Sequence, residues 1–203
     1  MAMKGRNVIR SLIALVAGIG TGILTLIGQK YLPGSLNSLA NSGAVWLIPA
    51  FFVAWSGRTA ISAVLLCAET LAACVVSYYL AEAALNAHAF SPHFYFWLWL
   101  ACAAVFGAVF GLGAYLRGRR GAHSHWGAGL LPAVFLSEGL SELIHLPDYA
   151  HMIPAVIGRI IVGLALYGII YRRDAFRKMP LVSFGALSAL GVVGYELLFR
   201  LTA

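Results

Sequence analysis

Long apolar segments alternate with short polar ones along the whole chain. Each apolar segment has about 18 or more residues, the length that a helix needs to cross a hydrocarbon core about 30 Å thick. The segments lack the strict alternation that transmembrane β-strands require, so the pattern predicts α-helices. Seven such segments can be drawn, at residues 8–29, 36–55, 60–80, 94–116, 126–144, 151–171 and 180–201.

The composition supports an all-α membrane protein. Hydrophobic residues make up 61% of the 203 residues and charged residues only 10%. The surface of a soluble domain with this composition would be far too apolar. We therefore expect a polytopic transmembrane helix bundle that forms a single integral membrane domain over residues 1–203. Six spans are the alternative, because the second segment starts among polar residues (NSLANSG) and contains Pro49.

The basic residues predict the orientation. The net charge is +7, and basic residues cluster in the stretches KGRNVIR, RGRR and YRRDAFRK. Each stretch adjoins an apolar segment, as the positive-inside rule expects of cytoplasmic loops, and this distribution argues against nucleic acid as a partner. We expect a multi-pass protein of the inner (plasma) membrane with a cytoplasmic amino terminus. Loss of the second span would invert all later loops and break the charge bias, which favours seven spans.

Two parts of the chain show a faint internal similarity. AGIGTGIL in the first segment resembles FGAVFGLGAYL in the fourth, and GAVWLIPAFF in the second resembles GAGLLPAVF in the fifth. The pattern predicts a 3+3 inverted repeat plus one helix, an arrangement in which transporters place a site near the membrane midplane. Chance similarity is the alternative, because small residues and Pro-Ala pairs are common in membrane helices.

Small residues form a smooth face on the first predicted helix. Ala14, Gly18 and Gly22 lie four residues apart, so another helix can approach them closely. Two interpretations stay open. The face packs within this chain, or it docks a partner membrane protein or a second copy of the chain.

Several ionisable residues lie inside predicted spans, where each costs roughly 2.5–3.5 kcal/mol on insertion scales. Glu138, Glu142 and His145 are separated by four and three residues, so they project from one face of the fifth helix. Lipid would penalise this stripe, and we expect it to face the bundle interior or a water-filled cavity. The other candidates are Glu69, Arg159 and Glu196.

The buried charges allow two interpretations. Arg159 is the one cation deep in the predicted bundle, and Glu138, at similar depth, is its expected partner in a structural ion pair. The acids outnumber this cation, and their surplus predicts a cation site or a proton relay with Glu69 nearer the inner exit. Asn41 enters the second helix from the outer side, where it caps that helix or lines an outward cavity.

Metal and catalytic chemistry have weaker support. Glu142 and His145 match the Glu-x-x-His spacing of carboxylate-bridged metal helices, but such sites need the motif on two helices and this chain has one copy. The sequence has no nucleophile motif, phosphate-binding glycine loop or redox pair, so we expect neither an enzyme nor a cofactor. An intramembrane metal enzyme remains the third alternative.

The stretches NSGAVWLIPAFFVAW and LLPAVFLSEGL resemble a group of uncharacterised small bacterial multi-pass membrane proteins with a domain of unknown function. This resemblance covers about residues 36–140 and implies a bacterial inner-membrane protein without supplying an activity. The chain is also similar in size to the substrate-binding subunits of energy-coupling-factor vitamin transporters, whose first helix has small residues at every fourth position. Those subunits usually have fewer spans and fewer buried charges.

The sequence therefore predicts a small transporter or solute-binding membrane protein with an interior acidic cavity open toward the outer side. Its solute would be a cation, protons or another small solute, bound by Glu138 and Glu142 while Arg159 balances the charge. One alternative is a non-catalytic accessory or assembly protein whose charges lock helices together. Another is a substrate-binding subunit of the energy-coupling-factor type.

Overall fold

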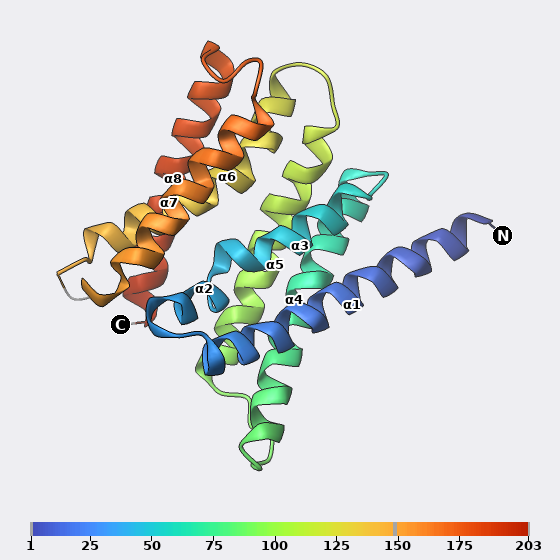
Figure 1. Ribbon diagram of the computed structural model, residues 1–203. Coiled ribbons are helices and arrows are strands. Elements are labelled where there is room, and N and C mark those ends of the chain that lie inside the picture. Colours follow the sequence, from blue (N-terminus) through green and yellow to red (C-terminus); the bar gives the residue numbers. More distant parts are fainter. Residues whose placement is uncertain (1, 148–149, 203) are drawn as a thin grey trace.

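In the described part of the chain, residues 2–147 and 150–202, the computed structural model has seven helical spans long and apolar enough to cross a membrane, and no strand. All seven predicted segments are confirmed, including the second, which spans Gly34–Trp55 as a chain of three short elements. The elements in Figure 1 are α1 (Ala2–Tyr31), η1 (Gly34–Leu36), α2 (Asn37–Ala40), α3 (Gly43–Trp55), α4 (Ala60–Leu85), α5 (Phe94–Arg117), α6 (Ala122–Ile144), η2 (Ala150–Met152), α7 (Ile153–Ile170) and α8 (Lys178–Thr202).

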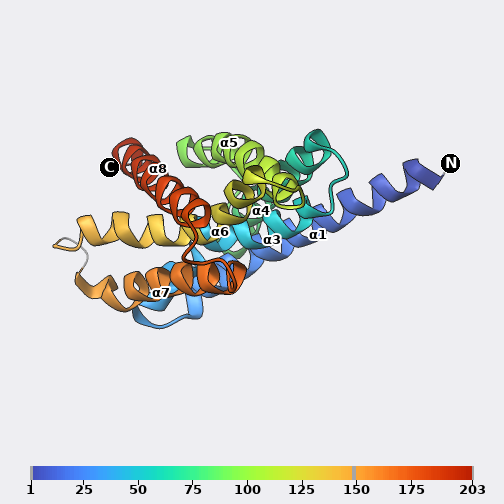
Figure 2. The same ribbon diagram turned by 90° about the horizontal axis from the view of Figure 1, so that it is seen from above.

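The helices form two groups (Figure 2). The first group contains α1, α3, α4 and α5, and α4 packs along both α1 and α5. The second group contains α6, α7 and α8, and α6 packs along the other two; α3 and α5 contact α6 and join the groups. In an inverted repeat, α5 and α7 would pack together as α1 and α4 do, but they have no comparable contact. The packing therefore gives the predicted repeat no support.

Glycines let α1 approach α4 closely. A Cβ atom on Gly18 would collide with the Thr70 carbonyl oxygen, and one on Gly22 would collide with the Ser77 side chain. Ala14 is fully buried in the same helix. The small-residue face is therefore occupied by α4 of the same chain, which agrees with the interpretation that the face packs within the chain.

The second span is interrupted between α2 and α3. Asn41 ends α2, and Ser42 has an extended backbone (φ −78°, ψ 124°) before α3 begins. The Val45 N–H donates to the Ser42 hydroxyl at 3.3 Å, so Ser42 rather than Asn41 caps α3. Irregular backbone is tolerated in a membrane only where it is buried in protein or lines a cavity. The break therefore needs polar partners from neighbouring helices.

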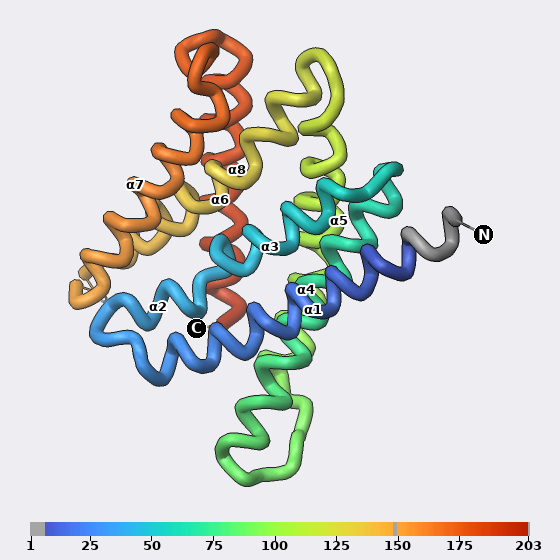
Figure 3. Tube along the Cα trace, turned by 45° about the vertical axis from the view of Figure 1, so that its right-hand side comes forward, coloured from blue at the N-terminus to red at the C-terminus, as the bar shows by residue number. Residues whose placement is uncertain are grey.

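Two loops with clustered basic residues lie at one end of the bundle. The loops after α5 and α7 form the upper end in Figure 1, and the tube in Figure 3 shows the same arrangement; the loop after α3, which contains Arg58, lies lower in the upper half of both views. At this end the Arg117 guanidinium lies over the Trp55 ring, 4.0 Å from its centroid. The loop after α4 and the end of α8 lie at the opposite end, as the alternation of seven spans requires.

Candidate functional site

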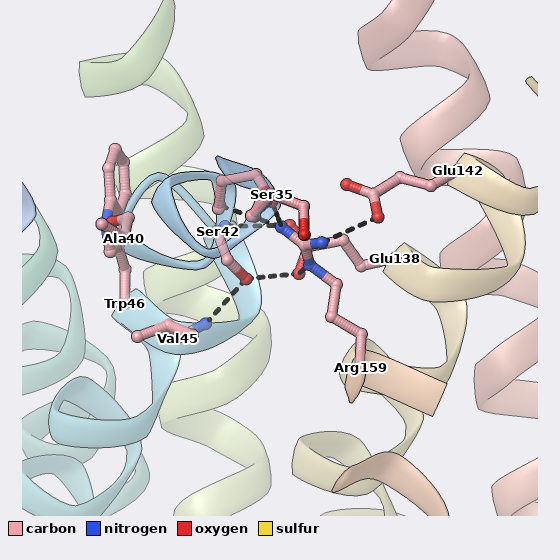
Figure 4. A network of polar contacts seen from close by, with 10 residues as sticks. Ser35, Ala40, Ser42, Val45, Trp46, Glu138, Glu142 and Arg159 are labelled. Atoms are coloured by element: carbon pink, nitrogen blue, oxygen red, sulfur yellow. Dashed lines mark hydrogen bonds and ion pairs between the residues drawn. The ribbon is translucent and has the colours of Figure 1, made fainter. Parts of the chain in front are cut away.

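The side chain of Arg159 lies at the centre of a buried polar network (Figure 4). It projects from α7 and is 2% exposed. Its Nη1 donates to Glu142 Oε2 at 2.8 Å, its Nη2 donates to the Ser38 carbonyl oxygen at 2.9 Å, and its Nε lies 3.4 Å from Glu138 Oε2. One guanidinium therefore joins three spans: α6, α7 and the broken second span.

Glu138 lies on the other side of the break. The Ser42 hydroxyl donates to Glu138 Oε2 at 2.5 Å, and the Gly43 N–H donates to Oε1 at 3.2 Å. This carboxylate thus meets the amino-terminal end of α3, where the helix dipole favours an anion. On the other side, Arg159 binds a backbone carbonyl of α2. Charged side chains of α6 and α7 therefore satisfy the backbone groups that the interruption frees.

The predicted contact between Arg159 and Glu138 is present, but Arg159 has a second carboxylate partner. Its contact with Glu142 is the shorter of the two, at 2.8 Å against 3.4 Å. When both carboxylates are ionised, one guanidinium leaves a net negative charge in the network. A buried charge without a partner is costly, and the partly exposed Glu142 is the carboxylate of the pair that solvent reaches.

A second polar cluster continues along the same face of α6. The Ser141 hydroxyl donates to Glu196 Oε1 at 2.6 Å, and His145 Nε2 lies 3.0 Å from Glu196 Oε2. The His145 ring also stacks on Phe199, with centroids 4.1 Å apart. The predicted stripe on α6 therefore contacts two different helices. Glu138 and Glu142 bind Arg159 of α7, and His145 binds Glu196 of α8.

Both clusters border a pocket of about 300 Å³. It lies between the first helix group and α8, and α5 and α8 make little contact with each other. Asn41 lines it, as one of its two interpretations predicts. The wall from α3, α4 and α5 consists of Gly43, Trp46, Leu47, Leu71, Val75, Trp99, Cys102, Ala103 and Phe106. The facing wall supplies the polar residues Glu138, Ser141, Glu142, His145 and Tyr195.

Two polar atoms on the pocket wall lack a protein partner. Glu142 uses only Oε2 to bind Arg159, and its side chain is 26% exposed. Among the described residues, no donor reaches Glu142 Oε1, and the Tyr195 hydroxyl makes no hydrogen bond. The Tyr195 hydroxyl lies close to the break, 3.4 Å from the point that a Cβ atom on Gly43 would occupy. Both atoms are therefore available to a ligand.

Glu69 is predicted to lie nearer the inner exit, and in the structure it does not line the pocket. It shares a face of α4 with the exposed Leu65 and Val76, opposite the buried Cys67 and Leu71. Within residues 2–147 and 150–202, no side chain forms an ion pair or hydrogen bond with it. Because α4 is apolar on all sides, the sequence pattern does not reveal which of its faces lies inside.

The two residues of the Glu-x-x-His motif have different partners in the structure. Glu142 binds Arg159, and His145 binds Glu196. In the part of the chain that the structure describes, no group of three or more His, Cys, Asp or Glu side chains is placed to hold a metal ion. The weak metal prediction for Glu142 and His145 therefore gains no support.

Sequence patterns do not identify the aromatic residues of the site. Trp46 reads as an interfacial anchor, yet it is buried, and its Nε1 donates to Thr25 Oγ1 at 2.9 Å. Its ring meets Trp99 edge-on, with centroids 5.6 Å apart. A signal for Tyr195 was present in its position directly before Glu196, because a polar pair in an apolar span indicates an interior face.

The fold and the site define a multi-pass α-helical membrane protein with a charged network beside a pocket. Residues 1–201 match DUF6518, a family of unknown function, and the chain belongs to that family. This agrees with the resemblance to uncharacterised membrane proteins, whereas the likeness to energy-coupling-factor subunits gains no support. Comparison with curated proteins and with solved structures gives no match.

Proposed function

We propose that this protein is a small membrane transporter or solute-binding membrane protein whose solute occupies the pocket beside α8. The observation that carries the proposal is that Glu142 lines the pocket and uses only one of its carboxylate oxygens, Oε2, to bind Arg159. A network that only held helices together would satisfy both oxygens within the protein. Ionisable groups inside membrane bundles commonly mark the path of a solute or a proton.

Each polar residue has a role in this proposal. Glu142 contacts the solute or carries a proton, and Arg159 balances its charge. Glu138 fixes Arg159 against the broken second span. Interrupted helices serve transporters in this way, because their ends present N–H and C=O groups that no helix turn satisfies. The proposal assigns no enzymatic step to the site.

We place the protein in the inner membrane of a bacterium with its amino terminus in the cytoplasm. The basic loops after α3, α5 and α7 support this orientation, since cytoplasmic loops are enriched in Lys and Arg. The pocket then lies toward the outer side, because it is lined by His145 and Thr202 at the ends of α6 and α8 that lie away from those loops.

Cysteine labelling tests whether water reaches the pocket from outside. Single cysteines replace Glu142 or His145 in a variant without the three native cysteines, and an impermeant thiol reagent is added to intact cells. Both positions should react, whereas cysteines at Leu140 and Leu143, which do not line the pocket, should react much less. Equal labelling of all four positions, or of none, would remove the main support for transport.

A non-catalytic assembly protein is the second candidate, and the contacts of Arg159 with three spans favour it. Replacing Glu138, Glu142 and Arg159 together with Leu or Met separates the two functions, because well-packed apolar replacements of a buried ion pair often preserve stability. If the protein is an assembly protein, the triple variant should still restore the growth of a strain that lacks the gene. If it is a transporter, the triple variant should fold but fail to restore growth.

A further inference from the structure

The two walls of the pocket differ in chemistry, and together they indicate the class of ligand. One wall is aromatic and aliphatic, with the edge-on pair of Trp46 and Trp99 at 5.6 Å. The other wall presents the free Oε1 of Glu142 and the unbonded hydroxyl of Tyr195. A ligand that satisfies both walls has a polar end and an apolar body.

The carboxylates at the pocket wall outnumber the guanidinium that pairs with them. Glu138 and Glu142 line the pocket, whereas Arg159, which pairs with both, does not. A ligand in the pocket therefore lies closer to the carboxylates than to the guanidinium. The polar end of the ligand should carry a positive charge, since a cation beside a half-buried carboxylate replaces the missing partner.

The size of the pocket limits the ligand. A cavity of about 150 Å³ accepts benzene, and small-molecule sites begin at about 300 Å³. At about 300 Å³, this pocket has room for one or two rings with a short polar group. A bare metal ion does not fit its chemistry, because a hard cation needs about six oxygen ligands and most of the wall is apolar.

We propose that the pocket binds a small organic cation. Its ammonium group lies beside Glu142 and Tyr195, and its body of one or two rings packs against Trp46 and Trp99. Aromatic rings suit this ligand because their faces attract cations as well as apolar groups. The inference rests on the proposed function, since it names the class of solute for the same pocket.

Binding of four probe compounds to the purified protein tests the proposal by calorimetry. Phenyltrimethylammonium carries the ring and the charge, tetramethylammonium only the charge, benzyl alcohol only the ring, and phenylacetate the ring with the opposite charge. The first should bind about tenfold more tightly than each of the others, because it alone combines ring packing with the attraction of its quaternary nitrogen to the Glu142 carboxylate and the aromatic faces. Equal binding of any other probe, or no binding of the four, would overturn the proposal.

Matched variants locate the binding site. Glu142→Gln keeps the shape of the side chain and should weaken phenyltrimethylammonium binding about tenfold without changing benzyl alcohol binding. Trp99→Ala should weaken both. Glu69→Gln makes the same substitution in a membrane helix outside the pocket and should change neither. Unchanged binding of phenyltrimethylammonium to folded Glu142→Gln protein would contradict the assignment.

The native Cys102 allows ligand binding to be measured in the unmodified protein. Cys102 lines the pocket, whereas Cys67 and Cys74 are buried. Phenyltrimethylammonium should slow the reaction of Cys102 with N-ethylmaleimide, followed by mass spectrometry, more than benzyl alcohol does at the same concentration. An unchanged rate would overturn the proposal.

Different results would contradict the proposed ligand class and the proposed function. If positions 142 and 145 are labelled from outside but the four probes bind alike, the ligand class is wrong and the aqueous pocket stands. If phenyltrimethylammonium binds selectively but neither position is labelled, the cation site stands and access from the outer side is wrong.

Discussion

The two groups of helices are held together by different chemistry. In the first group, glycines bring backbones into contact, as where Gly107 of α5 rests on Ala68 of α4. No ion pair links two helices of this group in the part of the chain that the structure describes. The second group also uses glycine, where Gly139 of α6 meets Ile160 of α7, but it adds a guanidinium between two carboxylates.

The comparison shows that this chain does not need charges to close its helices. Close packing of small residues and hydrogen bonds such as the one from the Tyr78 hydroxyl to Gln29 Oε1, at 2.8 Å, hold the first group together. The network of the second group must instead offset the cost of bringing charges into the membrane. It also lies beside the pocket, whose apolar wall the first group supplies with Trp46 and Trp99. A role in binding accounts for both observations.

Arg159→Met should have the largest effect on stability. The substitution leaves Glu138 and Glu142 without their cation, and breaking a buried ion pair in this way costs about 3–5 kcal/mol. The free energy of unfolding, measured by titration with a denaturing detergent, should fall by this amount. Arg172→Met removes an exposed arginine and is the control. A loss below about 1 kcal/mol for Arg159→Met would show that the network is not a stabilising contact of the second group.

Gly18→Ala should have the next largest effect and tests the first group. The added methyl group would collide with the Thr70 carbonyl oxygen, and overpacking of this kind costs about 1–3 kcal/mol. Gly20→Ala is a matched control two residues away, because nothing lies within 4 Å of its Cβ position. The control should be neutral or slightly stabilising, since Ala is the better helix former. Equal losses in both variants would mean that the close contact of Gly18 with α4 does not explain the loss, and the role of small residues in this group would be wrong.

The fold was largely predictable from the sequence, whereas the site was predictable only in part. Segment length and hydropathy specify the spans, because both reflect the thickness of the bilayer. The spacing of Glu138, Glu142 and His145 correctly places them on one helix face. Spacing within one helix cannot show which other helix faces it. The division of this stripe between Arg159 and Glu196 therefore required the structure.

Two other questions that the sequence leaves open have a similar origin. Ala14, Gly18 and Gly22 predict a close contact, but the same face would serve α4 or a partner equally well. Glu69 gives no sign of its direction, because α4 is apolar all round. Each of these questions concerns distances between helices, which periodicity along one helix does not contain.

Replacing Glu138, Glu142 and Arg159 together with Leu or Met should have a smaller effect on stability than Arg159→Met alone. The variant gives the second group the apolar chemistry of the first, and such replacements are often neutral or stabilising. The free energy of unfolding should lie within about 1 kcal/mol of the unmodified protein or above it. Selective binding of phenyltrimethylammonium should disappear at the same time. If the variant is stable and still binds this cation, the charged network is not needed for binding in the pocket.

Glu69→Gln should have the smallest effect of all. Glu69 is the acid at membrane depth in the first group, and it lies on the face of α4 that carries the exposed Leu65 and Val76. Among the described residues it has no partner to lose, and Gln preserves its size. Substitutions without such a partner change stability by about 0.5 kcal/mol or less. The free energy of unfolding and the binding of phenyltrimethylammonium should therefore both remain unchanged. A loss above about 1 kcal/mol would mean that a charged side chain also stabilises the first group. The contrast between a group closed without ion pairs and a group that carries charge for binding would then no longer hold.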